Sequence, residues 1–159
     1  MPHISSLKIE NYRALQHLEL TDLQPLNVFL GPNGCGKSTI FDAFQFIAEC
    51  LQTNVRKALE SRGRFHEVRS RGAKGPISFE ISFRESDLGA RQSRRITYRL
   101  EIGERDGRPV VQSEICRWSR KPGKPGRPYH FVSMQNGAGE AIPGEAPEDE
   151  DRRVPVTME

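Results

Sequence analysis

The residues most capable of chemistry lie near the start of the chain, at 31–39, where the sequence reads GPNGCGKST. They satisfy the pattern G-x-x-x-x-G-K-[ST], with Gly31 and Gly36 at the glycine positions and Lys37 and Ser38 after them. Glycines let the backbone curl so that successive N–H groups point inward, and a helix that begins near Lys37 would add the positive end of its dipole. A nest of this kind, a P-loop, is suited to a triphosphate.

The side chains of the motif predict how a nucleotide would be held. Lys37 would reach the β- and γ-phosphates, the Ser38 hydroxyl would ligate Mg²⁺, and Thr39 would hydrogen-bond the α-phosphate. The chain has no NKxD string, the motif that reads guanine, so the sequence favours ATP over GTP. Beyond Lys37 no catalytic residue is identified. The expected nucleotide-binding residues are Gly31, Pro32, Asn33, Gly34, Cys35, Gly36, Lys37, Ser38 and Thr39.

Cys35, inside the motif, has two interpretations. A thiol at a helix N-terminus among N–H donors can be unusually reactive, which would permit redox control. The plainer interpretation is a small residue tolerated at a variable position of the loop. Cys35, Cys50 and Cys116 have no short pairwise spacing, which fits neither a disulfide framework nor a zinc site and indicates reduced thiols.

The motif needs a strand before it and a helix after it. Apolar residues with a period near two predict strands at 4–9, 18–20 and 26–30, and the third runs directly into the first glycine. From Ile40 to Leu59 the apolar spacing lengthens to three and four, which predicts one helix of about six turns. Gly63 is its expected C-terminal stop.

The middle and the end of the chain have different patterns. Period-two alternation predicts an antiparallel β-meander, with Asp106 and Gly107 as a hairpin turn. Its strands are expected at 77–83, 96–102, 110–118 and 129–134. The loop 120–128 holds too much Pro and Gly for regular structure. Residues 137–155 are rich in Gly, Pro and acidic residues, which predicts a mobile loop or tail.

Charge follows the same division of the 159 residues. Lys and Arg outnumber Asp and Glu by 17 to 8 in residues 61–128, whereas residues 129–159 hold 2 basic and 7 acidic residues. The basic residues form two clusters: Arg62, Arg64, Arg69, Arg71 and Lys74, and then Arg120, Lys121, Lys124 and Arg127. These clusters would contact DNA phosphates. The alternative is that they keep a sheet face solvated, and the sequence favours this alternative because few aromatic residues lie among them to stack on bases.

We therefore expect three parts: strands, P-loop and first helix at 1–63, a basic antiparallel β subdomain at 64–134, and an acidic flexible tail or loop at 135–159. No apolar stretch approaches the roughly 20 residues that span a bilayer, and the N-terminus lacks a secretory pattern, which favours a cytoplasmic protein without membrane contact.

Two stretches resemble a known family. GPNGCGKST is similar to the P-loop of ABC-type ATPases, which commonly reads GPNGSGKS. LKIENYRAL, residues 7–15, resembles the opening of SMC, RecF and OLD-type ATPases, in which a strand ends in N-[FY]-[RK]; with FDAFQFIAE on the helix, the resemblance covers residues 4–50. It implies the N-terminal lobe of an ABC-type bacterial AAA-family ATPase, an α/β P-loop NTPase fold with the antiparallel meander beside the nucleotide site. It also implies that Arg13 lies near the phosphates and Asn33 toward the γ-phosphate; the alternative for Arg13 is an exposed turn residue.

The resemblance also shows what hydrolysis would still require. ABC-type ATPases use a Q-loop glutamine, an LSGGQ-like motif acting across a dimer, a Walker B segment and a switch histidine. The chain has no LSGG-like string and no run of four apolar residues followed by Asp. Gln135 is a conceivable Q-loop residue but is more simply a surface glutamine, and His130 fits an ordinary strand residue.

By the resemblance, the absent motifs lie in a C-terminal lobe. The expected function is ATP binding by an incomplete lobe, with hydrolysis only beside that lobe and in a homodimer, coupled to DNA repair, recombination or phage defence. Alone, the chain would turn ATP over slowly or not at all, because Mg²⁺ would lack a carboxylate and the attacking water a general base. The alternative is a non-hydrolytic nucleotide-sensing or nucleic-acid-binding module.

Overall fold

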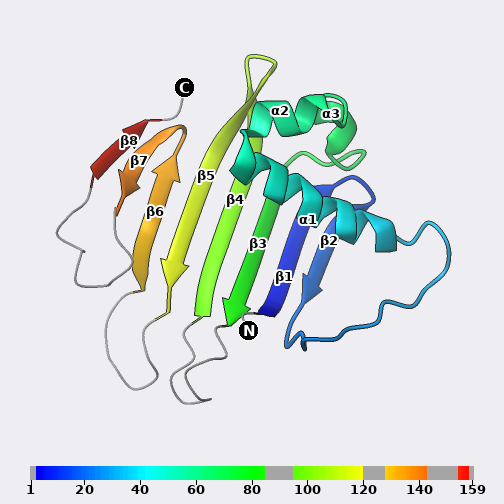
Figure 1. The fold of residues 1–159 in the computed structure, drawn as a ribbon. Helices are drawn as coiled ribbons and strands as arrows, with labels where there is room; N and C mark the ends of the chain where they lie inside the picture. Colours follow the sequence, from blue (N-terminus) through cyan, green and yellow to red (C-terminus); the bar gives the residue numbers. More distant parts are fainter. Residues whose placement is uncertain (1–2, 85–94, 120–127, 143–153, 158–159) are drawn as a thin grey trace.

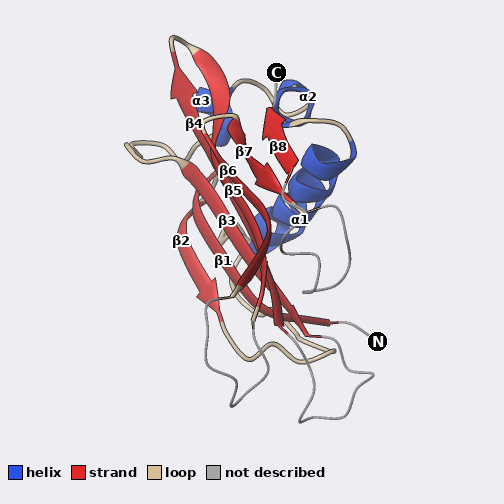
Figure 2. Cartoon of the chain, turned by 90° about the vertical axis from the view of Figure 1, so that its left-hand side faces the viewer, coloured by secondary structure: helices blue, strands red, loops and turns tan. Residues whose placement is uncertain are grey.

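One antiparallel sheet organises the chain, with helices against one of its faces (Figures 1 and 2). The computed structural model describes residues 3–84, 95–119, 128–142 and 154–157. Its eight strands lie in the order β2-β1-β3-β4-β5-β6-β7-β8. They are β1 (His3–Tyr12), β2 (Leu15–Leu20), β3 (Ile77–Arg84), β4 (Arg95–Arg105), β5 (Arg108–Trp118), β6 (Tyr129–Gln135), β7 (Ala138–Ala141) and β8 (Val154–Thr157). The helices are α1 (Lys37–Gln52), α2 (Val55–Glu60) and α3 (Phe65–Val68).

The predicted meander is confirmed. The strands expected at 77–83, 96–102, 110–118 and 129–134 lie within β3, β4, β5 and β6, each antiparallel to the next. Asp106 (φ 52°) and Gly107 (φ 73°) turn the chain between β4 and β5, both at the positive φ that a two-residue hairpin turn favours. Asn136 (φ 52°) and Gly137 (φ 84°) turn it in the same way between β6 and β7.

The core lies between the sheet and α1. Alternate residues of β1, β3 and β4 face it, because side chains of a strand point to opposite faces in turn. The rings of Tyr12, Phe46 and Phe79 pack together at its centre, with centroids 5.1–5.6 Å apart. The other buried members of these elements are Leu7, Ile9, Ile40, Ala43, Ile47, Ile77, Ile81, Leu100 and Ile102. This packing fixes the helix that begins at the glycine-rich loop.

The strand expected at 26–30 is absent, which corrects the prediction. Leu26, Val28 and Leu30 are 83%, 75% and 90% exposed, and no backbone ladder joins them to a described strand. The segment runs outward from the β2 edge before it returns to α1 (Figure 1). A strand needs a neighbour for its alternate N–H and C=O groups, and β2 pairs only with β1 within the described sheet. The alternating apolar pattern is real, but the segment runs away from the open edge of β2 and forms no ladder with it (Figure 1).

The single six-turn helix is also corrected. The chain leaves the helix at Thr53, whose hydroxyl donates to the Glu49 carbonyl at 2.8 Å, and a new helix begins after Asn54. The Asn54 side chain accepts from the Lys57 amide at 2.9 Å, which is the preferred way to cap a helix N-terminus. Apolar spacing continues across the break, so periodicity alone did not reveal it. Gly63 (φ 105°) follows α2.

The C-terminal segment differs from the expected loop or tail in part. β7 pairs with β6, and β8 pairs with β7, so 138–141 and 154–157 extend the sheet. The acidic run 148–151 and the loop 120–127 lie outside the described residues.

β1 also pairs with β3, so the expected parts 1–63 and 64–134 share one sheet. Of the helices in the described ranges, none combines the length and the apolar character needed to cross a membrane.

Candidate nucleotide-binding site

The glycine-rich loop leads directly into α1. Gly34 (φ 82°) and Gly36 (φ 97°) adopt the left-handed conformation that glycine tolerates best, which makes the tight curl possible. Gly36 is the N-cap residue of α1, no side chain caps the helix there, and the first turn holds no acidic residue. The first N–H groups of a helix have no intrahelical partner. The N-terminal end of α1 is therefore suited to binding an anion.

Lys37 lies across the loop. Its Nζ donates to the carbonyl oxygens of Gly31 and Pro32, each at 2.7 Å, and lies 3.7 Å from the sulfur of Cys35. An ammonium group has three donors, and two of them close the loop. The positive charge thus stands at the uncapped end of α1, where the motif predicts that a phosphate binds.

The other motif residues differ in exposure. Pro32, Asn33, Gly34, Cys35 and Ser38 are exposed, and Thr39 is half-buried. In the described part of the chain, no group of three or more His, Cys, Asp or Glu could hold a metal ion. The Ser38 hydroxyl remains the predicted magnesium ligand, one that would act together with phosphate oxygens.

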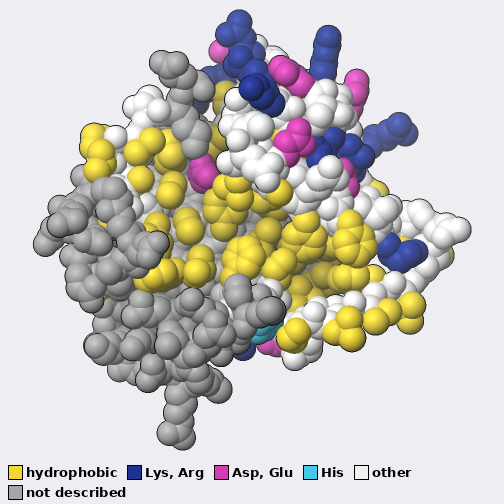
Figure 3. All heavy atoms as spheres, in the orientation of Figure 1, with side chains coloured by type: hydrophobic (Ala, Val, Ile, Leu, Met, Phe, Trp, Pro, Cys, Tyr) yellow, Lys and Arg dark blue, Asp and Glu magenta, His cyan; other side chains and the backbone are white. Residues whose placement is uncertain are grey.

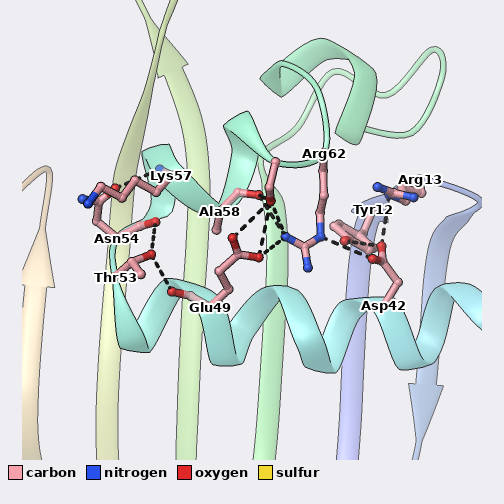
Figure 4. Close-up of polar contacts among 10 residues, drawn as sticks. Tyr12, Arg13, Asp42, Glu49, Thr53, Asn54, Lys57, Ala58 and Arg62 are labelled. Atoms are coloured by element: carbon pink, nitrogen blue, oxygen red, sulfur yellow. Dashed lines mark hydrogen bonds and ion pairs between the residues drawn. The ribbon is translucent and has the colours of Figure 1, made fainter.

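The β1–β2 hairpin holds Arg13 beside α1. Arg13 (φ 48°) follows β1, and its backbone N–H donates to the Val68 carbonyl at 2.7 Å. Its Nε lies 3.1 Å from Oδ2 of Asp42, and its side chain is 39% exposed. Two residues further on, Leu15 lies against Gly36 of the loop. Arg13 therefore lies in the turn between β1 and β2, with its side chain held against the N-terminal half of α1 (Figure 4). Its place near a phosphate stays a prediction.

A polar cluster that the sequence did not predict ties α1 to its neighbours (Figure 4). Arg62, whose side chain is 7% exposed, donates from Nε to Oδ1 of Asp42 at 3.3 Å and from Nη1 to Oε2 of Glu49. The hydrogen bond from Arg62 holds the pKa of Glu49 below its usual value. Asp42 and Glu49 stand seven residues apart and so share a helix face, which is the signal that could have revealed the cluster.

Tyr12 completes this cluster. Its hydroxyl donates to Oδ2 of Asp42 at 2.6 Å. Burial, and then this bond to a carboxylate, raise the pKa of Tyr12, so its hydroxyl stays protonated as a donor. Asp42 thus accepts hydrogen bonds from Tyr12 and Arg62 and forms an ion pair with Arg13.

The first basic cluster is divided by the fold. Arg62 is buried and paired with carboxylates, so it is not available to DNA, which corrects its assignment. Arg69 is half-buried, with its guanidinium carbon 5.2 Å from the centre of the Phe65 ring. Arg64, Arg71 and Lys74 are exposed. Figure 3 shows Lys and Arg side chains over α2 and α3, interspersed with acidic ones. The second cluster, Arg120, Lys121, Lys124 and Arg127, lies outside the described residues.

Gln135 does not join the site. It ends β6, and β3, β4 and β5 separate that strand from β1, a span of about 19 Å at the usual strand spacing. Its side chain is exposed, as expected of a surface glutamine. His130 lies within β6, as expected.

The three cysteines are free, as the sequence predicts, and differ in exposure. Cys35 is exposed in the loop, whereas Cys50 and Cys116 are partly buried. Burial raises the pKa of the Cys50 thiol to about 12 and raises the pKa of Cys116 as well.

Comparison with known proteins gives the family. Residues 6–127 match the model of the AAA domain. The chain is 35% identical over 57 residues to the DNA replication and repair protein RecF of Saccharophagus degradans, covering 36% of the chain and 16% of that protein. RecF of Acinetobacter baumannii is 46% identical over 57 residues, covering 35% of the chain and 16% of RecF. The chromosome partition protein Smc of Coxiella burnetii is 30% identical over 111 residues, covering 66% of the chain and 9% of Smc.

The chain thus spans 9–16% of the length of these relatives. The resemblance carried by GPNGCGKST and LKIENYRAL is confirmed. The chain belongs to the AAA-domain family, as an SMC/RecF-like ATPase region.

Proposed function

We propose that the chain binds Mg²⁺-ATP in the loop 31–39. The observation that carries this proposal is the position of Lys37, whose Nζ bridges the Gly31 and Pro32 carbonyls at the uncapped N-terminus of α1. An ammonium group and free helix N–H donors at one point are the chemistry that recognises a triphosphate. The lysine would exchange carbonyl oxygens for those of the β- and γ-phosphates.

The remaining roles follow from the same loop. The exposed Ser38 hydroxyl would ligate Mg²⁺, Thr39 would bond the α-phosphate, and Asn33 would face the γ-phosphate. Arg13 would approach the phosphates from the β1–β2 hairpin. Mg²⁺ supplies charge neutralisation between the β- and γ-phosphates, and ATP is favoured because the chain lacks the guanine-reading motif.

Hydrolysis is proposed to need a C-terminal ATPase lobe and a second copy of the complete protein. The support is an apolar surface beside the site: Leu26, Val28, Leu30 and Phe41 are 61–90% exposed. Hydrophobic side chains are visible along this segment and across the same face (Figure 3). Large apolar side chains gathered on a surface mark an interaction site. The extended, unpaired segment 26–30 would take a neighbouring strand there.

The test is calorimetric binding of Mg²⁺-ATP and Mg²⁺-GTP, with phosphate release measured alongside and Lys37→Ala as the control. We expect ATP binding that Lys37→Ala abolishes, weaker GTP binding, and little or no turnover. ATP binding that survives Lys37→Ala would contradict the assignment to this loop. Turnover that depends on Lys37 would contradict the need for a further lobe.

Contact with DNA is a second proposal, supported by the exposed Arg64, Arg71 and Lys74 and by relatives that are named for DNA replication, repair and chromosome partition. Such contact would couple ATP binding to DNA repair, recombination or phage defence. Phosphate contacts release counterions, so affinity should fall steeply with salt. A flat response near zero affinity in a salt titration with duplex DNA would remove this proposal and leave nucleotide sensing as the non-hydrolytic alternative.

A further inference from the structure

The Asp42 carboxylate is held from two sides by buried groups. Tyr12, which is fully buried, donates to Oδ2 at 2.6 Å. Arg62, with a side chain 7% exposed, donates to Oδ1 at 3.3 Å. Arg62 is itself fixed by Glu49, by the Ala58 carbonyl at 3.1 Å and by the Phe46 ring, whose centre lies 5.3 Å from the guanidinium carbon. The position of this carboxylate is therefore set by the core.

Arg13 is the third partner of Asp42, through an ion pair, and differs from the two hydrogen-bond donors Tyr12 and Arg62. Its contact uses Nε, at 3.1 Å from Oδ2, and its side chain is 39% exposed. Within the described part of the chain, its two terminal amino groups have no carboxylate partner. A guanidinium held through Nε keeps its outer edge for an anion, and this edge suits two oxygens of one phosphate.

The backbone beneath Arg13 is fixed independently of Asp42. The Arg13 N–H donates to the Val68 carbonyl at 2.7 Å, and the Ser70 N–H donates to the Asn11 carbonyl at 3.0 Å. The Ser70 hydroxyl donates to the Leu15 carbonyl at 3.1 Å on the other side of the turn. Loss of Asp42 would therefore remove the ion pair of the Arg13 side chain, leave only the Tyr12 ring 5.9 Å from its guanidinium carbon, and keep the backbone in place.

We propose that Asp42 is a positioning residue of the nucleotide site, which holds the guanidinium of Arg13 ready for a phosphate of the bound ATP. The inference rests on the proposed function. Asp42 stands on α1, five residues after Lys37, so one rigid helix carries both the lysine and the carboxylate that orients the arginine. A free arginine side chain loses rotamer freedom when it binds, and a carboxylate that holds it beforehand removes part of that loss.

Glu49 provides a matched control on the same helix. Glu49→Gln removes the same charge and the same kind of contact with Arg62 as Asp42→Asn, but Glu49 has no contact with Tyr12 or Arg13. A merely structural role of the cluster predicts the same behaviour from both variants. A positioning role predicts that only Asp42→Asn changes the contribution of Arg13 to the affinity for Mg²⁺-ATP.

The experiment measures the dissociation constant of Mg²⁺-ATP with and without Arg13→Gln in three backgrounds: wild type, Asp42→Asn and Glu49→Gln. All are measured well below the lowest melting temperature. In wild type and in Glu49→Gln, Arg13→Gln should raise the dissociation constant about tenfold, the usual size of one charge-assisted hydrogen bond. In Asp42→Asn the same change should raise it less than about twofold, because the arginine is no longer held.

Two results would overturn the inference while ATP binding itself stands: an Arg13→Gln effect of the same size in Asp42→Asn and wild type, or no effect of Arg13→Gln in wild type. Absence of Lys37-dependent ATP binding in wild type would overturn the proposed function and this inference together. If Asp42→Asn does not fold, Tyr12→Phe replaces it. Tyr12→Phe keeps every charge and the ring packing but removes one donor to Asp42. In this background, Arg13→Gln should raise the dissociation constant by a factor between about twofold and about tenfold. An effect as large as in wild type overturns the inference.

Discussion

The Leu15 side chain packs directly against Gly36, so that a Cβ atom added to Gly36 would lie 2.8 Å from Cδ2 of Leu15. Leu15 is the first residue of β2, and Gly36 is the last residue before α1. The hairpin that carries Arg13 and the loop that carries Lys37 are thus in direct contact. The two halves of the proposed site are held together by packing, with no need for a ligand to join them.

This contact predicts different results for two glycine substitutions. Gly34→Ala, at φ 82° with nothing within 4 Å of the new Cβ, should lower the free energy of unfolding by about 1 kcal/mol, from backbone strain alone. Gly36→Ala adds the clash with Leu15 and should cost about 2–4 kcal/mol. Thermal and urea unfolding of the two variants measure the difference. Equal losses would show that Leu15 and Gly36 are not packed in solution.

Removal of the Arg62 guanidinium should destabilise the fold. Arg62→Met leaves two carboxylates facing a buried apolar side chain, and we expect a loss of about 2–3 kcal/mol, below the value for a fully buried pair because Asp42 and Glu49 are 25% and 30% exposed. Arg64→Met, at an exposed position two residues away, is the control and should change stability by less than about 0.5 kcal/mol. Urea denaturation distinguishes them. Similar small losses would mean that Arg62 is solvated, as its place in the basic run first indicated.

The same cluster predicts a pH dependence. Arg62 lowers the pKa of Glu49 from its ordinary value of 4.5, so the pair contributes stability above that value and loses it as the pH falls through the lower pKa of the folded protein. The melting temperature of wild type should exceed that of Glu49→Gln at pH 6, and the gap should narrow as the pH drops below 4.5. A gap that widens on acidification would have the wrong sign for a depressed carboxyl pKa.

The sequence predicted the elements whose pattern is local. Strands with period two in 77–83 and 96–102, and a hairpin at Asp106 and Gly107, follow from side-chain alternation and turn chemistry. The loop 31–39 was recognisable because a phosphate-binding loop requires those residue types in that order. None of these features depends on a distant part of the chain.

The remaining features depend on contacts that no local pattern contains. Residues 26–30 alternate like a strand, but strand pairing depends on where the chain runs, and this segment leaves the open edge of β2 without pairing to it. Arg62 looked like one more member of a basic run, yet its side chain is buried because Asp42 and Glu49 face it from α1. The break after α1 was hidden because the apolar spacing continues through Thr53 and Asn54.

The cysteines should differ in reactivity. Cys35 is exposed, whereas burial raises the pKa of Cys50 to about 12, so little Cys50 thiolate forms at neutral pH. Iodoacetamide at pH 8 should label Cys35 first, and Mg²⁺-ATP should slow that labelling. Peptide mass mapping measures the rate at each cysteine. Labelling of Cys50 at the rate of Cys35 would contradict the packing of α1 on the sheet. Unchanged labelling of Cys35 at saturating ATP would place the thiol outside the nucleotide contact.

The exposed apolar segment should tolerate polar substitution in this chain. Leu26→Gln and Leu30→Gln, at positions 83% and 90% exposed, should change the free energy of unfolding by less than about 0.5 kcal/mol. Leu100→Ala, at a position 1% exposed, should cost about 2–5 kcal/mol. Unfolding curves test both. A large loss from the glutamine variants would show that the segment packs on this chain rather than against a partner lobe.

The most direct test of nucleotide binding at the loop is amide hydrogen exchange of the peptide that covers 31–39, with and without Mg²⁺-ATP, in wild type and in Lys37→Ala. Phosphate bound at the N-terminus of α1 would take up the uncapped N–H groups there. Exchange of this peptide should slow on ATP addition in wild type and stay unchanged in Lys37→Ala. If ATP leaves exchange of the 31–39 peptide unchanged but slows exchange in another part of the wild-type chain, nucleotide binding at this loop is contradicted.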